Sequence, residues 1–330
     1  MSSATTTCFT DHLASLIRTV RGRGLAPLVV STSVGLVGNS PRPVGSQIVS
    51  RSSDHTAGMI SGGCVDPAIA LDGLQLLETR ESGSRLQTYG EGSHYIDLRL
   101  PCGSSILVLH DPVWPEEILL KILEASARRQ AITLHYDHKS RQKRIEPAPE
   151  SGQTDHFEAH WKNGEIAAEN FLGYSKTLVP QTRLVLAGEN NAISPYLELF
   201  ARSHGFETLL SDRISAVSGL DRWTAYVTLL HDHEQEIPLL QKALGSPAFY
   251  IGALGSRKTH SNRIRLFKAL GMNDQTIERI EGPIGLDIGA STPAEIATSI
   301  MGSIISCFRQ PHLSRMTLQA RRRENSPTTG

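Results

Sequence analysis

Hydrophobic and polar positions in the first half of the chain follow helical spacing at some places and strand spacing at others. Residues 11–20 put four aliphatic side chains on one stripe, which predicts a helix that ends at the glycines just after it. β-branched residues dominate 27–34, so a strand is expected there, and the sheet resumes at 47–50. Glycines and prolines interrupt the intervening residues 35–46, where we expect an exposed functional loop.

The segment that follows predicts a short strand, which turns through Gly62 and Gly63 into a helix. Asp66 is the expected N-cap of this helix, and Pro67 is its expected first residue. Cys64 therefore lies immediately before a helix N-terminus, on a turn whose two glycines allow the backbone to bend sharply.

Cys102 is expected in a similar place, next to Gly103 and between strands at 96–100 and 106–109. The next predicted helix has acids in its first turn and arginines in its last, as the helix dipole favours. The elements expected after Cys102 are this helix at 115–129, a strand at 131–136, a basic surface turn at 138–144, a hairpin at 157–171 around Asn163-Gly164, and a linker at 173–182.

Strands and helices alternate from residue 183 onward, a pattern typical of a parallel sheet with helices on its faces. Strands are expected at 184–187, 207–210, 225–230 and 248–253, and helices at 195–204 and 258–270. Thr292, Pro293 and Glu295 form the N-terminal signature of a last helix that ends near residue 309.

The predicted fold class is α/β, with two domains. An N-terminal α/β domain is expected over 1–175, and a Rossmann-like parallel-sheet domain over 176–310. The tail over 311–330 is rich in Arg, Ser and Thr and lacks apolar periodicity, so we expect it to be disordered.

The composition narrows the classes of partner. The 330 residues include 33 Lys plus Arg and 33 Asp plus Glu, so no excess positive charge attracts nucleic acid or an acidic membrane. No run approaches the roughly 20 apolar residues of a membrane-spanning helix, and the N-terminus lacks a signal-peptide pattern. We therefore expect a soluble cytoplasmic protein with no nucleic-acid and no membrane partner.

The four cysteines, at positions 8, 64, 102 and 307, lie far apart without a CxxC pair. This spacing fits neither a disulfide scaffold nor a tetrahedral zinc site, so free thiols are expected. Before a helix N-terminus, the thiolate of Cys64 or an anionic ligand would be stabilised. Free cysteine more often packs as a small hydrophobic residue, and for both Cys64 and Cys102 this alternative stays open.

The first turn of the second domain has the position of a Rossmann phosphate turn. Gly188 follows the first strand, and Asp212 ends the second strand, where a ribose-binding acid is expected. The glycine fingerprint is broken, because Asn190 stands at the second glycine position and Glu189 adds negative charge beside it. The sequence therefore argues against NAD(P) binding at this turn, even though the fold is appropriate.

A second glycine turn, with Gly252, Gly255 and Ser256, opens a helix whose first turn carries Arg257 and Lys258. Cations at a helix N-terminus are unfavourable unless an anion joins them, so this turn is a candidate phosphate site. A tight turn with solvated basic residues is the alternative interpretation.

Taken together, these segments resemble the XdhC/CoxI family of molybdenum-cofactor maturation factors over nearly all of residues 11–309. The blocks that carry the resemblance are 38–46, 62–65, 100–103, 250–259 and 283–289, which runs into 292–295. Several independent blocks in this order are far more specific than a lone glycine motif. The chain departs from the family at 188–193, where members usually carry a fuller dinucleotide fingerprint and one residue fewer before the helix.

The resemblance implies a chaperone that binds the molybdopterin form of the molybdenum cofactor. Such a protein shelters the cofactor while a cysteine desulfurase supplies a terminal sulfur, and then hands it to a xanthine dehydrogenase or a related molybdenum hydroxylase. By the match, Cys64 and Cys102 are thiols near molybdenum, and Arg42 and Arg257 hold anionic parts. The full set of predicted cofactor-binding residues is Arg42, Gly63, Cys64, Cys102, Gly103, Gly252, Gly255, Ser256 and Arg257.

Two other classes stay open. An NAD(P)-dependent oxidoreductase would use the Rossmann-like domain, and a thiol enzyme would use Cys64 or Cys102 as nucleophile with His55 or His94 nearby. His231-Asp232-His233 could ligate a metal, although such a pair of histidines more often ends a strand with polar groups. The client enzyme, the exact cofactor form and the oligomeric state, with a homodimer as one option, also stay open.

Overall fold

A computed structural model of the chain describes residues 12–22, 24–25, 27–79, 83–91, 103–149, 154–188, 191–211, 217–230 and 232–309. The chain divides into two compact units, Met1–Pro180 (unit 1) and Gln181–Gly330 (unit 2). The domain boundary expected after residue 175 falls inside a strand of unit 1, β9 (Phe171–Leu178).

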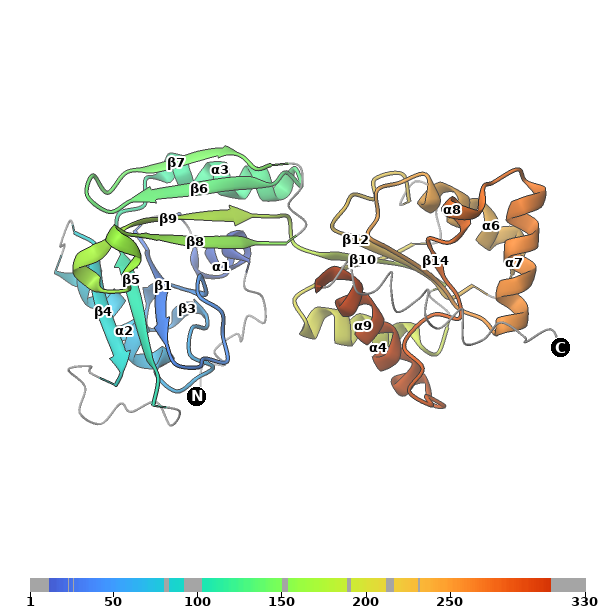
Figure 1. Cartoon of the computed structure of the whole chain (residues 1–330), viewed down its shortest axis with the longest axis horizontal. Coiled ribbons are helices and arrows are strands. Elements are labelled where there is room, and N and C mark those ends of the chain that lie inside the picture. Colours follow the sequence, from blue (N-terminus) through green and yellow to red (C-terminus); the bar gives the residue numbers. More distant parts are fainter. Residues whose placement is uncertain are drawn as a thin grey trace. The chain divides into compact units, whose positions relative to one another are not determined.

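The first sheet of unit 1 is antiparallel, with the strand order β3-β2-β1-β5-β4 (Figure 1). Its strands are β1 (Val29–Val37), β2 (Gln47–Ser52), β3 (His55–Gly58), β4 (Arg85–Gly90) and β5 (Ser105–Asp111). Helix α2 (Asp66–Glu78) packs Ile69 against one face, where it meets Ile48 and Val108. Helix α1 (Leu13–Val20) belongs to the core on the other face.

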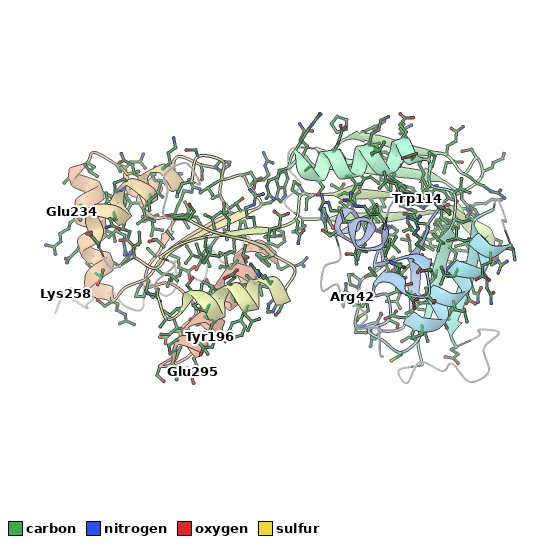
Figure 2. The ribbon with its side chains drawn as sticks, turned by 180° about the vertical axis from the view of Figure 1, so that it is seen from behind. Arg42, Trp114, Tyr196, Glu234, Lys258 and Glu295 are labelled. Atoms are coloured by element: carbon green, nitrogen blue, oxygen red, sulfur yellow. The ribbon has the colours of Figure 1, made fainter. Side chains whose placement is uncertain are left out.

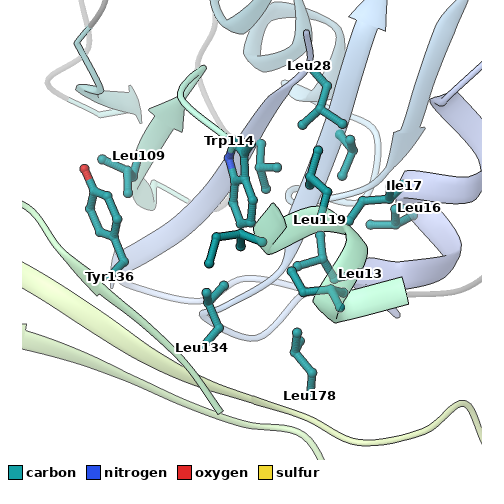
Figure 3. Close-up of a cluster of buried hydrophobic side chains, with 14 of the residues drawn as sticks. Leu13, Leu16, Ile17, Leu28, Leu109, Trp114, Leu119, Leu134, Tyr136 and Leu178 are labelled. Atoms are coloured by element: carbon teal, nitrogen blue, oxygen red, sulfur yellow. The ribbon is translucent and has the colours of Figure 1, made fainter. Parts of the chain in front are cut away.

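The second sheet of unit 1 has the antiparallel order β7-β6-β9-β8 and shares a core with the first sheet. Its strands are β6 (Ile132–Asp137), β7 (Lys143–Pro147), β8 (His156–Trp161) and β9. Helix α3 (Glu116–Ala127) contributes Leu119, which lies with Trp114, Leu134 and Leu178 in this core (Figure 3). Each such buried side chain contributes about 1.5–3 kcal/mol to stability. Because α1, α3 and both sheets all contribute side chains to this cluster, they share one hydrophobic core.

Unit 2 contains a parallel sheet with the order β11-β10-β12-β13-β14. Its strands are β10 (Arg183–Ala187), β11 (Glu207–Leu210), β12 (Thr224–Thr228), β13 (Tyr250–Ala253) and β14 (Ile280–Glu281). Leu184 and Leu186 pack with α4 (Ser194–Ser203) and α9 (Pro293–Arg309), whereas Val185 packs with α6 (His233–Leu244) and α7 (Arg257–Ala269). Helices therefore cover both faces, as the alternating pattern predicts.

The start of α9 confirms its predicted signature. The Glu295 carboxylate accepts hydrogen bonds from the N–H groups of Ser291 and Thr292, both at 2.9 Å, and the Thr292 hydroxyl accepts one from the Glu295 N–H at 3.3 Å. These donors lower the pKa of Glu295 to about 2. No helix among the described residues is long and apolar enough to cross a membrane.

The loop expected at 35–46 begins later than predicted. Strand β1 continues to Val37 and pairs with β5, after a bulge between Ser33 and Gly35. A Cβ atom at Gly35 would lie 2.7 Å from Cγ2 of Ile166, so this glycine lets the 166 segment close on the strand. The sequence pattern was wrong here because the same glycine is also typical of a loop.

The linker expected at 173–182 is wrong over 173–178, because β9 pairs with both β6 and β8 in the interior of the second sheet. The boundary between the two units, after Pro180, falls in the rest of that stretch. Gly173 suggested a linker, but a Cβ atom there would lie 2.0 Å from the Tyr136 carbonyl oxygen, so close strand pairing requires glycine. The hairpin expected at 157–171 is confirmed in its first strand, β8, but the antiparallel partner of β8 is β9 and not residues 166–170. Its second strand begins at Phe171, after two short 3₁₀ turns.

The basic segment expected as a surface turn at 138–144 is a turn only in part. Strand β7 begins at Lys143, whose side chain is 1% exposed and lies 2.7 Å from the Asp111 carboxylate. Burial raises the pKa of Asp111, and the neighbouring ammonium opposes that shift. An ion pair therefore takes this cation into the core of unit 1.

Candidate functional site

Three loops of unit 1 lie against one another at one end of its first sheet, β3-β2-β1-β5-β4. The Asn39 N–H donates to the Ser104 hydroxyl at 2.9 Å, and this hydroxyl donates to the Asn39 carbonyl at 2.7 Å. On the other side, a Cβ atom at Gly62 would lie 3.0 Å from Cγ of Pro41. The segment 38–41 therefore lies between the turn that carries Cys64 and the start of β5. We call this arrangement the loop cluster; it comprises residues 38–46, 60–65 and 103–104.

Cys64 is an exposed free thiol in the loop cluster. The two residues before it, Gly62 and Gly63, have φ values of 81° and 112°, which a residue with a side chain rarely adopts. The carboxylate of Asp66 accepts hydrogen bonds from the N–H groups of Ile60 at 3.0 Å, Ser61 at 2.7 Å and Gly63 at 2.8 Å. Three donors from the preceding turn thus surround one carboxylate.

This geometry corrects the predicted role of Asp66. The N-cap of α2 is Val65, and Asp66 is the first helical residue. Its side chain points back to the turn instead of capping the helix N–H groups, because the two glycines fold the turn over the start of the helix. Pro67 lies inside the first helical turn, as expected.

The second half of the 38–46 loop is fixed from the other sheet. The Lys176 ammonium, on β9, donates to the Gly45 carbonyl at 2.8 Å and to Gln47 Oε1 at 2.7 Å. Lys176 is 4% exposed, so its charge is buried beneath the loop. Arg42, in the middle of this loop, is half-buried, and its N–H donates to the Ser40 hydroxyl at 3.2 Å.

Sequence reasoning missed Lys176 and Ser104. Lys176 lies in the stretch expected as a linker, and a single lysine between apolar positions of 171–178 was the only signal for it. Ser104 is fully buried and directly follows Gly103, which is exposed with a φ of 65°. Cys102 and His94 lie outside the described residues, so the structure places Gly103 in the loop cluster and leaves the role of Cys102 a prediction.

A chain of buried polar groups fixes α2 to the sheet beneath it. Tyr89 donates to the Asp72 carboxylate at 2.5 Å, its hydroxyl lies 2.8 Å from His110 Nε2, and His110 Nδ1 lies 2.8 Å from the Ser31 hydroxyl. Burial lowers the pKa of His110 to about 4, so the imidazole is neutral at pH 7. The helix that carries Asp66 therefore has a fixed position on β1, β4 and β5.

His55, a candidate base, is the first residue of β3, and its Nδ1 is 2.9 Å from the Ser52 hydroxyl. Within the described part of the chain, no hydrogen bond joins it to Cys64. His231 lies outside this part, and Asp232 caps α6 by accepting from the Glu234 N–H at 2.9 Å. The described residues contain no group of three His, Cys, Asp or Glu side chains that could hold a metal ion.

In unit 2, two backbone N–H groups of the turn after Gly188, those of Ile193 and Ser194, are hydrogen-bonded within the turn. Asn191 Oδ1 accepts from the Ile193 N–H at 2.9 Å, and the Asn191 carbonyl accepts from the Ser194 N–H at 3.2 Å. Pro195, next in α4, has no N–H to offer. Asn191 Nδ2 donates to the Leu229 carbonyl at 3.1 Å, so this side chain bridges the ends of β10 and β12. A dinucleotide pyrophosphate needs free N–H donors at such a turn, and Asn191 accepts from two of them. Glu189, Asn190 and Asp212 lie outside the described residues, so the expected lack of NAD(P) binding stays a prediction.

The turn from Gly252 to Arg257 is built differently. A Cβ atom at Gly252 would lie 2.4 Å from Ile284 Cδ1, and one at Gly255, whose φ is 144°, would lie 2.9 Å from Thr259. The Ser256 hydroxyl caps α7 by accepting from the Thr259 N–H at 3.2 Å. Both glycines are therefore required by close packing.

The first turn of α7 leaves two cations at the surface. Arg257 and Lys258 are exposed, and Figure 2 labels Lys258 at the lower end of α7, where the helix begins. Behind them, the buried Arg263 guanidinium bonds the Glu236 carboxylate at 3.0 Å through both Nε and Nη2, and donates to the Leu254 carbonyl at 3.0 Å. The predicted site residues thus form two groups, one in unit 1 and one in unit 2.

Comparisons with known proteins match a family in both units of the chain. Residues 25–90 match the XdhC and CoxI family, and residues 172–304 match the XdhC Rossmann domain. The molybdenum cofactor insertion chaperone PaoD of Escherichia coli (strain K12) is 30% identical over 280 residues, which cover 84% of this chain and 82% of PaoD. The chain belongs to the XdhC and CoxI family. The resemblance stated from the sequence blocks is therefore confirmed.

Two further relatives of this XdhC and CoxI family chain are informative in part. The uncharacterized protein YqeB of Escherichia coli (strain K12) is 32% identical over 91 residues, which cover 28% of this chain and 17% of YqeB. A crystal structure described as a xanthine dehydrogenase from Bacillus halodurans superposes with a TM-score of 0.66 at 20% identity, covering 90% of this chain and 95% of that one. At this identity the superposition confirms the fold alone, including the Rossmann-like domain.

Proposed function

We propose that the chain is a cytoplasmic chaperone that binds the molybdopterin form of the molybdenum cofactor at the loop cluster. The observation that carries this proposal is that the 38–46 loop contacts both the turn that carries the exposed thiol of Cys64 and Ser104, which directly follows the family block 100–103. The similarity to PaoD, a molybdenum cofactor insertion chaperone, supports it. Handing over a bound cofactor requires an accessible site, and Cys64 lies on the surface of unit 1.

The chemistry of the loop cluster fits this cofactor. The bound cofactor would supply a sulfur-loving metal and a phosphate, which thiolates and guanidinium groups recognise. Cys64 would contact the metal end, and Arg42, on the neighbouring loop, would hold an anionic part. Cys102 would add a second thiol next to Gly103. Buried Lys176 and Ser104 hold the 38–46 loop in the shape that this requires.

The turn at Gly252 is the second part of the proposal. Arg257 and Lys258 are exposed at the start of α7, and the Ser256 cap leaves their own N–H groups at the helix end available to an anion. We propose that they bind a phosphate group in unit 2. Gly252 and Gly255 shape the turn, and the buried Arg263 fixes it from behind.

The partners follow from this role. We propose that a cysteine desulfurase adds the terminal sulfur while the chain holds the cofactor, and that the client is a molybdenum hydroxylase of the xanthine dehydrogenase type. A homodimer remains a prediction. The alternative function, an NAD(P)-dependent oxidoreductase, is disfavoured because Asn191 occupies the donors of the turn at Gly188.

Replacing Cys64 in cells tests the proposal. With Cys64→Ser as the sole source of the chaperone, the client enzyme is expected to accumulate in an inactive form that lacks cyanide-releasable sulfur. Cys307→Ser, a half-buried cysteine on α9, is the matched control and should leave client activity normal. Full client activity with Cys64→Ser would make Cys64 a structural residue and contradict the proposal.

A further inference from the structure

We infer that Asp66 is the residue that positions Cys64 for the cofactor, by filling the N–H groups of the turn with its own carboxylate. This inference rests on the proposed function, since it concerns the thiol that the proposal assigns to the cofactor. It adds a residue that touches no cofactor atom and acts through the backbone that carries Cys64.

The first argument is the number and direction of the hydrogen bonds. Asp66 Oδ1 accepts from Ile60 at 3.0 Å and Ser61 at 2.7 Å, and Oδ2 accepts from Gly63 at 2.8 Å. Backbone N–H groups that converge in this way form a site for an anion, and bonds to an ionised group are about twice as strong as neutral ones. The carboxylate thus fixes the turn on both sides of Gly62.

The second argument is that the turn needs such a partner. Gly62 and Gly63 both have positive φ and carry no side chain, so little else restrains this part of the backbone. A Cβ atom at Gly63 would meet nothing within 4 Å, which shows that packing leaves space around it. Among the described residues, the Gly63 N–H donates a hydrogen bond only to Asp66. Cys64 is the next residue in the chain.

The third argument is that Asp66 itself is held still. It begins α2, and Asp72, one and a half turns further along, is tied through Tyr89 to the sheet. The Ser61 hydroxyl also accepts from the Val65 N–H at 3.0 Å, which closes the turn against the helix. A rigid series of contacts thus leads from the sheet through α2 and Asp66 to Cys64.

The filled turn has a consequence for cofactor recognition. Because the carboxylate already occupies three donors, the turn does not offer them to a phosphate, and it presents the thiol alone. Loss of the carboxylate would free these donors, so they could stabilise the thiolate while the turn loses its fixed shape. Reactivity of Cys64 and cofactor affinity should then change in opposite directions.

A double-mutant cycle between Asp66→Asn and Cys64→Ser tests the inference in the full-length chain. The probe is molybdopterin cofactor freshly released from a purified molybdenum hydroxylase, and the readout is its dissociation constant. An amide has one acceptor oxygen in place of two, so Asp66→Asn should weaken binding about tenfold when Cys64 is present. In the Cys64→Ser background, Asp66→Asn should have no further effect.

Alkylation of Cys64 by iodoacetamide provides a readout without the cofactor, with Cys307 as the internal reference. Asp66→Asn should speed alkylation of Cys64, whereas Glu78→Gln, which removes the same charge at the exposed far end of α2, should not. If Asp66→Asn does not fold, Asp66→Glu, which keeps both oxygens one methylene further out, replaces it in both measurements.

The outcomes separate this inference from the proposed function. An unchanged alkylation rate, or an equal loss of affinity in the presence and absence of Cys64, would overturn the positioning role and leave the chaperone proposal standing. If Cys64→Ser alone left affinity unchanged, the proposed function would fail first.

Discussion

Each unit contains a glycine turn that leads into a helix, but the two turns present different chemical groups at the surface. Before α2, the aspartate of the first helical turn folds back and occupies the N–H groups of the turn, so a thiol remains at the surface. Before α7, Ser256 caps the helix and the buried Arg263 donates to the Leu254 carbonyl. The cations of Arg257 and Lys258 therefore remain at the surface. The difference shows that the side chain that accepts from the N–H groups of the turn, more than the glycines, decides which groups the turn presents at the surface.

The turn after Gly188 gives a third outcome. There the side chain and carbonyl of Asn191 use the donors at the start of α4, and no charged or reactive group is presented by the described residues of the turn. The glycine itself has a φ of 102°, and a Cβ atom would lie 3.0 Å from the backbone of Leu229. In this Rossmann-like topology, close packing against Leu229 is therefore sufficient to require the glycine.

The largest expected effect is the loss of support behind the Gly252 turn. Arg263 and Glu236 are each 1% exposed, so Arg263→Met should remove the guanidinium from a buried carboxylate and cost about 3–5 kcal/mol of the free energy of unfolding. Urea denaturation followed by circular dichroism measures this. Lys268→Met, which removes an exposed ion pair to Asp274, is the control and should cost less than about 1 kcal/mol. Equal losses in both variants would contradict a supporting role for Arg263.

The polar chain under α2 makes unit 1 sensitive to acid. The pKa of His110 is about 4 in the folded chain and about 6.5 when unfolded, so the unfolded state binds the extra proton between these values. Stability contributed by the neutral imidazole is therefore full above about pH 6.5 and decreases as the pH falls toward 4, by about 3 kcal/mol in total.

Urea unfolding at pH 7 and pH 4.5 checks this, with His110→Gln as the variant that no longer titrates. The difference between the two pH values should be smaller in His110→Gln than in the parent chain. His204→Gln, an exposed histidine on unit 2, is the control and should behave like the parent. An identical pH dependence in His110→Gln and the parent would show that this group does not titrate as described.

The exposed cations of α7 should matter less for stability and more for binding. Replacing Arg257 and Lys258 together with Ala should weaken binding of molybdopterin cofactor, because charge-assisted contacts contribute about 1.5–3 kcal/mol each and are screened by salt. Equilibrium binding at low and high salt measures the effect. Arg265→Ala, further along the same helix, is the control, and normal binding by the double variant would reduce the turn to a structural feature.

The smallest expected effect is the response to dinucleotides. Because Asn191 uses the donors at the start of α4, calorimetry with NAD and NADP should show no tight binding. A micromolar dissociation constant that Asp212→Ala abolishes would restore the dinucleotide site and remove the contrast between the Gly188 and Gly252 turns.

Much of the fold was predictable because the parallel sheet of unit 2 has regular apolar strands and marked helix starts, as at Thr292. The errors come from glycine, which is equally typical of loops and of close strand contacts. Gly35 and Gly173 lie inside strands, where Ile166 and the Tyr136 carbonyl leave no room for a side chain. The sequence analysis also did not predict β4 or α6, and α6 contains Pro238, a residue that usually signals a helix end.

For the candidate site, sequence blocks predict which segments take part, but not the contacts that hold these segments in place. Blocks of the family pattern identified Cys64 and the 38–46 loop, and the structure brings these segments together. The reversal of Asp66 from cap to turn partner depends on backbone angles at Gly62 and Gly63, which no sequence pattern specifies. Lys176 reaches the loop from a strand 129 positions after Gln47, a long-range contact that spacing cannot reveal.

Direct titration of the full-length chain with molybdopterin cofactor tests the central claim, that the loop cluster binds the cofactor through Cys64. Cofactor freshly released from a molybdenum hydroxylase is added to the parent chain, Cys64→Ser and Cys307→Ser under reducing conditions, and bound cofactor is separated and measured. We expect saturable binding by the parent and Cys307→Ser, and at least about tenfold weaker binding by a folded Cys64→Ser. Equal affinity in all three proteins would contradict it.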